Sequence, residues 1–358
     1  MFRPRTFFLV LLFSGCTLLL SGQDDCNQLG VWVWRIEQTG FSHETLARNL
    51  AAMDVKRVYM KVADGAIDSL AWPELVDTEL VESYHAEGVE IWGWSYNYDS
   101  NKERQAAALY RAAQTGYDGF VVDVEMEFDG LVEPLRLLFE AFDQARHQVL
   151  DDGIAQDSFP LYCTTWGNPR DHNFSISSID PYVDAFMPQT YVELWGQNFI
   201  DNISYWIEEG NVEYRFLGAT KPIHHIASTT TPDMTSDLIE EFLMASGPET
   251  SLWRVPGGGV SLDIWQTWQD VDWSTDFCKL VSSNEEIGSE SPQFYPNPTL
   301  DHVRLSRSDG SYNLYDLYGN KLKAIAEGVQ SISLTELDAG IYILRSETDG
   351  SGIRIIKL

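Results

Sequence analysis

The sequence of 358 residues has few basic residues, few cysteines and only one long apolar run. Lys and Arg number 24 against 54 Asp and Glu, a formal net charge of −30. Nucleic acids and anionic membrane surfaces are bound through an excess of Lys and Arg, so this charge argues against both as partners. The four cysteines show no spacing with histidine that indicates a zinc site, and we expect no metal and no cofactor.

The long apolar run lies at the N-terminus, where residues 7–20 follow Arg3 and Arg5 and precede the small pair Ser21-Gly22. This order is typical of a secretory signal peptide, which we predict over residues 1–22. A lipoprotein cleavage box at residues 12–16 is the alternative. No later segment approaches the roughly 20 apolar residues that span a bilayer, so we expect no membrane span after signal removal.

Export would place the remaining cysteines in an oxidising space, which favours disulfide formation. Cys26 and Cys278 lie near the two ends of one predicted domain, and a bridge between them would join those ends. Cys163 lies in a predicted strand, and we expect it to be a small buried apolar residue.

Residues 27–280 alternate short apolar strands with helical patterns, which is typical of parallel βαβ units. Eight strands are predicted, at Leu29–Ile36, Arg57–Val62, Glu90–Tyr98, Gly119–Glu127, Leu161–Gly167, Ala185–Val192, Phe216–Lys221 and Val260–Trp268. The helices predicted between them include His43–Met53, Asp77–Glu87, Lys102–Gln114, Glu133–Leu150, Ile200–Glu209 and Ser236–Ala245. Eight strands in about 250 residues predict a (β/α)8 TIM barrel. A doubly wound nucleotide-binding sheet is disfavoured, because residues 37–41 lack the glycine-rich turn.

A polar linker is predicted at residues 281–292, and residues 293–358 are predicted to form a small all-β C-terminal domain. Its strands are expected at Val303–Ser306, Ser311–Leu317, Ile332–Leu334, Ile341–Ser346 and Ile353–Leu358. Four of its segments, 294–298, 315–319, 337–342 and 355–358, resemble the C-terminal sorting domain of the type IX secretion system of Bacteroidetes. The resemblance implies that the secretion translocon is a partner and that the protein is secreted or held at the cell surface. A carbohydrate-binding β-sandwich is the alternative.

Three acids follow one another at every second position in the fourth predicted strand. Asp123, Glu125 and Glu127 would share one face, because successive strand side chains point to opposite sides. Buried carboxylates are costly, so the cluster indicates the floor of a functional cleft at the C-terminal end of the barrel. Two close carboxyls suit a retaining glycosidase, since the charge of one keeps a proton on the other. A calcium or magnesium site formed by the three acids is the alternative.

Other strand ends contribute aromatic and amide side chains, which suit sugar rings and sugar hydroxyls. The predicted substrate-binding residues are Glu127, Trp94, Tyr96, Trp166, Gln189, Trp265, Asp263 and Lys61. Lys61 is expected to supply a counter-charge to the acids. Trp32 is expected either in the cleft or between strand and helix, and His224-His225 is expected to be a polar loop pair.

Three segments resemble glycoside hydrolase family 18, the chitinases. They are Asp118-Gly119 with the sequence Asp-Val-Glu at 123–125, residues 187–191, and Gly258-Gly259-Val260 followed by Trp265. The resemblance implies that Glu125 is the general acid, that Asp123 orients an acetamido group acting as internal nucleophile, and that Tyr191 holds that group. The sequence departs from the family at Val121, where another Asp is usual, and in the third strand.

Segments 58–65 and 264–266 resemble the family 25 lysozymes, although the acid of their first strand is missing. The barrel therefore resembles a divergent member of the group that contains both families. The predicted function is a secreted, retaining glycoside hydrolase that cleaves a β-linked polysaccharide containing N-acetylhexosamine, such as chitin, peptidoglycan or an N-glycan. The alternative is a catalytically silent barrel that binds glycan or mediates surface adhesion.

Overall fold

The computed structural model describes residues 27–65 and 75–273, and most strands of the C-terminal part. There it describes residues 294–295, 302–305, 310–316, 321–326, 328–329, 331–337, 340–346 and 352–357. The chain divides into two compact units, Met1–Cys278 and Lys279–Leu358. The predicted signal peptide, the linker 281–292 and the predicted Cys26–Cys278 disulfide lie outside the described residues. Among the helices of the described ranges, none is long and apolar enough to cross a membrane.

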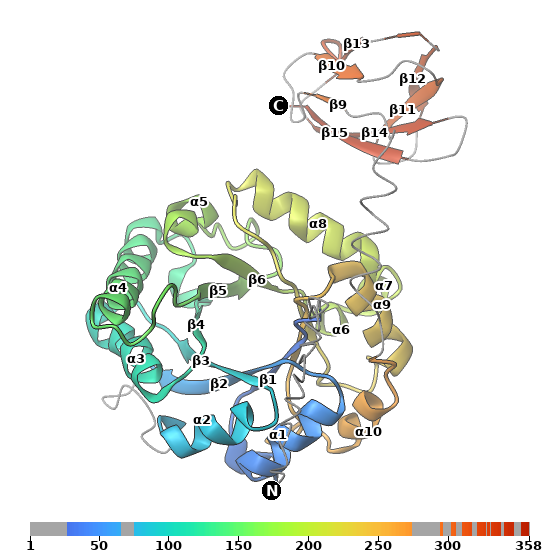
Figure 1. Ribbon diagram of the computed structural model, residues 1–358. Helices are drawn as coiled ribbons and strands as arrows, with labels where there is room; N and C mark the ends of the chain where they lie inside the picture. The colour runs from blue at the N-terminus through green and yellow to red at the C-terminus, as the bar shows by residue number, and fades with distance from the viewer. Residues whose placement is uncertain are drawn as a thin grey trace, which may run out of the picture. The chain divides into compact units, whose positions relative to one another are not determined.

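The first unit is a closed barrel of eight parallel strands paired in chain order, with helices around it (Figure 1). The strands are β1 (Gly30–Val33), β2 (Arg57–Asp64), β3 (Glu90–Tyr96), β4 (Gly119–Asp123), β5 (Leu161–Trp166), β6 (Ala185–Gln189), β7 (Ile226–Ser228) and β8 (Ser251–Trp253). Pairing of Gly30 with Ser251 closes the ring. The predicted (β/α)8 fold is therefore confirmed.

Three of the described α-helices begin after a polar side chain that accepts a hydrogen bond from an amide of the first turn. Ser42 accepts from the amide of Thr45 at the start of α1, and Thr235 accepts from the amide of Leu238 at the start of α9. The α-helices are α1 (His43–Ala52), α2 (Thr78–His85), α3 (Lys102–Thr115), α4 (Val132–Asp151), α5 (Ile176–Ile179), α6 (Val192–Trp195), α7 (Gln197–Ile200), α8 (Ile203–Phe216), α9 (Ser236–Ser246) and α10 (Asp263–Gln269). Short 3-10 helices cover Ile36–Gln38, Met126–Phe128 and Asp180–Tyr182.

The last two predicted strands are wrong. Phe216 is the last residue of α8 rather than the start of a strand, and Asp263–Gln269 is α10 rather than part of strand eight. The true β7 and β8 have three residues each, too few for a period-two pattern to stand out. Their position depends on pairing with neighbouring strands, because β8 hydrogen-bonds to β7 and to β1.

The fourth strand is also shorter than predicted. It ends at Asp123, and Glu125 has φ −130° and ψ −134°, outside the regular strand conformation. A 3-10 turn follows at Met126–Phe128. Strict alternation therefore does not extend to Glu127, which reaches the neighbourhood of the other acids through a turn.

The barrel interior is filled by large aromatic side chains that lie against glycines. A Cβ atom on Gly119 would come within 2.6 Å of the Trp92 ring, and one on Gly30 within 2.5 Å of the Tyr59 ring. These glycines let the rings occupy the barrel axis. The buried members of the interior cluster are Trp32, Tyr59, Trp92, Trp94, Val121, Met187 and Ile226. The barrel is thus a packed core below its upper rim.

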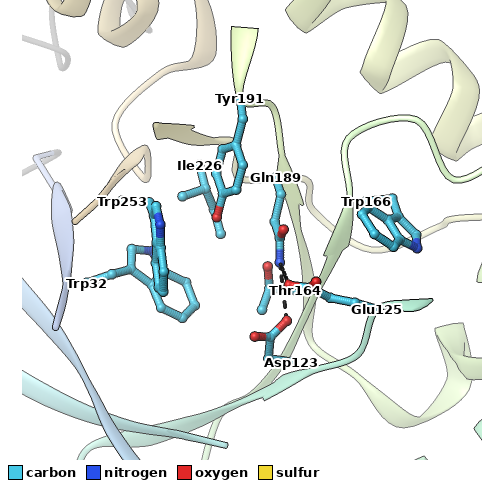
Figure 2. A pocket seen from close by; sticks show the side chains of 9 residues that line it. All are labelled: Trp32, Asp123, Glu125, Thr164, Trp166, Gln189, Tyr191, Ile226 and Trp253. Carbon is cyan, nitrogen blue, oxygen red and sulfur yellow. Dashed lines mark hydrogen bonds between the residues drawn. The ribbon is translucent and has the colours of Figure 1, made fainter. Parts of the chain in front are cut away.

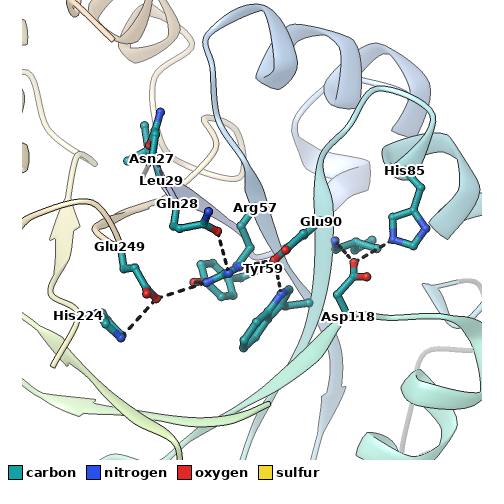
Figure 3. Close-up of polar contacts among 12 residues, drawn as sticks. Asn27, Gln28, Leu29, Arg57, Tyr59, His85, Glu90, Asp118, His224 and Glu249 are labelled. Atoms are coloured by element: carbon teal, nitrogen blue, oxygen red, sulfur yellow. Dashed lines mark hydrogen bonds and ion pairs between the residues drawn. The ribbon is translucent and has the colours of Figure 1, made fainter. Parts of the chain in front are cut away.

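A network of charges closes the end of the barrel where the strands begin (Figure 3). Arg57, the first residue of β2, donates from Nε to Glu90 Oε2 at 2.8 Å, and its guanidinium lies 4.3 Å from the centre of the Trp92 ring. Glu249 Oε2 lies 3.8 Å from Arg57 and 3.3 Å from His224 Nε2. Each buried charge at this end therefore has a partner of opposite sign or a polar neighbour.

The second unit contains two antiparallel sheets, ordered β13-β10-β9 and β12-β11-β14-β15. The strands are β9 (Phe294–Tyr295), β10 (His302–Leu305), β11 (Tyr312–Asp316), β12 (Lys321–Ile325), β13 (Ser331–Ser333), β14 (Gly340–Ser346) and β15 (Gly352–Lys357). Its core includes Val303, Leu314, Ile332, Leu344 and Ile355. The predicted all-β fold is confirmed, although the sequence analysis missed β9 and β12.

Candidate functional site

A pocket of about 250 Å³ opens at the end of the barrel where the strands finish (Figure 2). Its walls come from β1, β5, β6, β7 and β8 and from the residues that end β4. The lining residues are Trp32, Asp123, Glu125, Thr164, Trp166, Gln189, Tyr191, Ile226 and Trp253. Five of the predicted site residues therefore meet in one pocket, at the end of the barrel where TIM-barrel chemistry takes place.

Two carboxyl groups are held together by one amide. Gln189 Nε2, at the end of β6, donates to Asp123 Oδ1 at 3.2 Å and to Glu125 Oε1 at 3.0 Å. Both bonds are drawn in Figure 2. Because the two oxygens share one nitrogen donor, the carboxyl groups are close neighbours. An amide cannot ionise, so Gln189 holds this arrangement whether the acids are protonated or charged.

Burial raises the pKa of both carboxyl groups. The pKa of Asp123 lies well above its ordinary value because the group is buried and because Glu125 adds a second negative charge. The pKa of Glu125 is also raised, chiefly by burial. The hydrogen bond from Gln189 and the charge of Lys61 act in the opposite direction on Glu125. The pair therefore retains a proton at higher pH than an exposed carboxyl does, as a general acid requires.

The Tyr191 phenol enters the pocket from above the carboxyl pair (Figure 2). Burial raises the pKa of this phenol well above its usual value, and the charges of Asp123 and Glu125 raise it further. The hydroxyl therefore stays neutral and is able to donate a hydrogen bond to a group in the pocket.

Glu193, which the sequence places at the end of the sixth strand with Gln189 and Tyr191, does not line the pocket but fixes the backbone next to Tyr191. Its carboxylate accepts hydrogen bonds from the hydroxyls of Ser228, Thr230 and Thr231 at 2.6, 2.9 and 3.0 Å, and from the amide of Thr230 at 2.8 Å. These bonds tie α6 to the segment after β7. In the sequence this contact is indicated only by the run of polar residues at 228–231. Nothing in the sequence shows that this run pairs with Glu193.

Trp166 forms a side wall held in a fixed orientation. Its Nε1 donates to Asp129 Oδ1 at 2.9 Å, and its ring stacks on His172 with ring centres 3.8 Å apart. The ring of His172 lies 3.1 Å from Asp129 through Nδ1. The indole therefore presents its surface to the pocket with little freedom to turn.

Four predicted residues lie beside the pocket rather than in its lining. The Tyr96 hydroxyl donates to Glu127 Oε2 at 2.7 Å. Lys61 Nζ lies 3.2 Å from Asp64 Oδ2 and over the ring of Trp94, which is buried in the barrel interior. Lys61 still acts on the acids through its charge, since it lowers the pKa of both Asp123 and Glu125.

Two predicted residues, Asp263 and Trp265, are not part of the pocket lining. Both lie on α10, and Trp265 packs against the rings of Phe41 and Trp268 at 5.1 and 5.7 Å. The sequence predicts both residues on the eighth strand, because they follow the pair Gly258-Gly259. The strand end is Trp253, which lines the pocket and joins Arg254 through a cis peptide bond.

Trp32 and the histidine pair also have defined positions. Trp32 lies inside the barrel and lines the pocket, which excludes its packing between strand and helix. The pair His224-His225 lies in a loop as predicted, but this loop precedes β7 instead of following the seventh strand, and neither residue lines the pocket. His225 is 1% exposed, and the Thr190 hydroxyl lies 2.8 Å from its Nδ1. Cys163 is buried as predicted.

The described ranges contain no group of three His, Cys, Asp or Glu side chains arranged to hold a metal ion. Asp123 and Glu125 both accept from the amide nitrogen of Gln189, and Glu127 accepts from Tyr96. Oxygens that point toward hydrogen-bond donors are not directed at a common cation.

Residues 293–357 match the family described as "Secretion system C-terminal sorting domain". The C-terminal unit is a sorting domain. Such a domain directs handling by the type IX secretion system, so the protein is exported to the cell surface or secreted. The predicted sorting domain and the predicted localisation are thereby confirmed. No curated protein matches the whole chain in sequence at a significant level.

Solved structures similar to the chain include chitinases. A chitinase from Chromobacterium violaceum has 10% identity and a TM-score of 0.45, with 68% of this chain and 98% of that chain covered. A family 18 chitinase from Pseudoalteromonas aurantia has 9% identity and a TM-score of 0.45, with 68% and 99% covered. Human YKL-39, described as a pseudo-chitinase that retains chitooligosaccharide binding, has 11% identity and a TM-score of 0.41, with 57% and 66% covered.

Proposed function

We propose that the barrel is an exported glycoside hydrolase that cleaves a β-linked polysaccharide containing N-acetylhexosamine. The observation that carries the proposal is the pair Asp123 and Glu125, joined by Gln189 in a pocket walled by Trp32, Trp166 and Trp253. Aromatic walls suit the C–H faces of sugar rings, and a carboxyl with a raised pKa suits protonation of a glycosidic oxygen.

In this proposal Glu125 is the proton donor. It is nearer to solvent than Asp123, since it lies beyond the end of β4 in the pocket wall. Its raised pKa keeps the proton that the leaving oxygen needs when the glycosidic bond breaks. After departure of the leaving sugar, the Glu125 carboxylate takes a proton from the water that completes hydrolysis.

Asp123 and Tyr191 are the residues proposed to act on the acetamido group. The Tyr191 hydroxyl donates to the acetamido oxygen and holds it below the anomeric carbon. The Asp123 carboxyl orients the acetamido nitrogen, so that the carbonyl oxygen attacks the anomeric carbon as an internal nucleophile. The acetamido oxygen attacks from the face opposite the leaving sugar, and water later attacks from the face that the leaving sugar occupied, which breaks the bond between the anomeric carbon and the acetamido oxygen. The two inversions together give retention of configuration.

A second candidate function is glycan binding without hydrolysis. Val121, two residues before Asp123 in β4, is fully buried in the interior cluster where the chitinase pattern has another acid. An apolar side chain there cannot accept a proton or a hydrogen bond from Asp123. This candidate predicts saturable binding to a polymer with no new reducing ends.

The test is release of reducing ends by the purified chain from chitin oligomers, peptidoglycan and N-glycans. Glu125→Gln should abolish release, because an amide has no proton to give, while the thermal unfolding midpoint stays unchanged. Glu208→Gln, an exposed acid on α8, is the matched control and should retain full turnover. Undiminished turnover in Glu125→Gln would refute the assignment. Binding of a polymer by the unsubstituted protein without release of reducing ends would favour the second candidate.

A further inference from the structure

A second cavity, of about 460 Å³, lies between the segment after β5 and helices α6, α7 and α8. Its volume is within the range of small-molecule sites in proteins, about 300–1,000 Å³. The lining includes three aromatic residues, Trp195, Phe199 and Trp206, each only partly buried. Neighbouring aromatic rings that remain partly exposed together form an apolar surface, and such surfaces are found in ligand-binding grooves.

The three rings form a continuous aromatic wall. The centres of the Phe199 and Trp206 rings are 4.5 Å apart with 32° between their planes, and those of Trp195 and Phe199 are 5.4 Å apart at 74°. Such a wall offers flat faces at different angles. Pyranose rings stack through C–H groups on surfaces of this kind.

The polar part of the lining favours a neutral ligand that is rich in hydroxyl groups. The one cation in the lining, Arg170, is tied to Glu213, which accepts from its amide at 2.7 Å and lies 3.9 Å from its guanidinium. The acids of the lining, Asp171, Glu209 and Glu213, outnumber this cation. Asn168, Asp171 and Glu209 add amide and carboxylate groups, which bind hydroxyls and repel anions. An oligosaccharide without acidic groups fits this lining, and a phosphate or uronate does not.

The second cavity adjoins the pocket of the carboxyl pair. A Cβ atom on Gly167 would lie 2.8 Å from the Trp195 ring, so the ring packs directly on that residue. Gly167 follows Trp166, which lines the first pocket, and Trp195 ends the short helix α6 that begins after Tyr191. Two short segments therefore contribute to both cavities: Trp166 and Tyr191 line the first, and Gly167 and Trp195, which follow them in the chain, line the second.

We propose that this cavity is a second saccharide-binding site, which takes a neutral oligosaccharide through stacking on Trp206 and Trp195. The proposal rests on the proposed function only in taking glycan as the ligand. A site beside the first pocket would hold another part of the same polymer and raise its effective concentration at the carboxyl pair.

The test is fluorine NMR of the full chain labelled with 5-fluorotryptophan, in the Glu125→Gln background so that saccharides stay intact. Each signal is assigned by its loss in a single Trp→Phe variant. Titration with cellotetraose and chitotetraose should shift the Trp206 and Trp195 signals in a saturable way. Trp206→Ala and Glu209→Ala should weaken that binding about tenfold or more. Phe216→Ala and Glu208→Ala, on the same helix and outside the lining, should leave it unchanged.

The two proposals fail in different ways. Shifts of the Trp166 and Trp253 signals without shifts of Trp206 and Trp195 would overturn the second site and leave the proposed function standing. Shifts of Trp206 and Trp195 in a protein that hydrolyses no glycan would support the second site and remove the enzymatic assignment. Equal shifts in the variants and the controls would also overturn the second site, because they would place the saccharide elsewhere.

Discussion

The two ends of the barrel interior use buried charge in opposite ways. Where the strands begin, Arg57 is paired with Glu90 at 2.8 Å and lies near Glu249 (Figure 3). Where the strands finish, Asp123 and Glu125 accept hydrogen bonds from one neutral amide (Figure 2). The pKa of both carboxyl groups is raised, chiefly by burial. Paired charges hold a structure together, whereas adjacent like charges keep a proton available. We therefore expect the first end to contribute stability, and the second end to carry the proposed chemistry.

The largest effect should come from a substitution in the carboxyl pair, which is expected to lower kcat without lowering the free energy of unfolding. Asp123→Asn is expected to lower kcat by about a hundredfold or more, because Asp123 orients the internal nucleophile and a misplacement of about 1 Å has an effect of that size. The free energy of unfolding should stay equal or rise, because the substitution removes a buried ionisable group. Steady-state kinetics on the substrate identified above and urea unfolding measure the two quantities. Loss of stability with intact kcat would contradict the contrast between the ends.

The opposite result is expected at the other end of the barrel. Arg57→Met leaves Glu90 and Glu249 without their cation, and should lower the free energy of unfolding by about 1.5–3 kcal/mol, as for loss of a hydrogen bond to a charged group. The kcat of the folded fraction should not change, because the pocket is at the far end. Arg136→Met, which breaks an ion pair on the surface of α4, is the control and should cost less than about 1 kcal/mol. Equal costs for the two variants would show that the buried network adds no stability.

A smaller effect is expected from His225, which directly precedes β7. Burial lowers the pKa of His225 to about 3, whereas the unfolded chain has an ordinary histidine. Between pH 6.5 and about 3 the unfolded state binds the extra proton, so the free energy of unfolding falls as pH falls, by up to about 1.4 kcal/mol per pH unit. Urea unfolding at several pH values should show a shallower fall in His225→Asn. The exposed His147→Asn is the control and should follow the original slope.

The smallest effect concerns the pH dependence of catalysis. Lys61 lowers the pKa of Glu125, so Lys61→Met should raise that pKa and let the acid keep its proton at higher pH. The descending alkaline limb of kcat/KM should therefore move to higher pH. A limb that stays in place or moves down would mean that the charge of Lys61 does not reach the proton donor. Lys102→Met, far along the chain on α3, is the control.

The sequence predicts those parts of the fold whose pattern extends over several neighbouring residues. Strands one to six and the clustering of Asp123, Glu125, Gln189 and Tyr191 could be predicted, because each lies at the end of a buried strand. The predicted fourth strand extends beyond the end of β4. The residues after Asp123 continue the alternation of polar and apolar residues, although their backbone forms a turn. Boundaries of this kind depend on backbone angles that sequence patterns do not encode.

The rest of the site depended on contacts between distant segments. Trp253 was missed because β8 has three residues, and its place follows from closing the barrel against β1. Trp265 was misplaced for the same reason, since the segment after the glycines forms α10. The structural role of Glu193 could not be predicted, because its hydrogen-bond partners lie about 35 residues further along the chain.

The aromatic layer beneath the pocket also determines how molecules enter and leave. Trp32 packs on Trp94 and on Tyr59, and Trp94 packs on Trp253, with ring centres 4.6 to 5.7 Å apart. These packed rings fill the barrel axis below the carboxyl pair. If the proposed function holds, a saccharide therefore enters the pocket, and leaves it, on the side where the strands end, and none of it passes through the barrel axis.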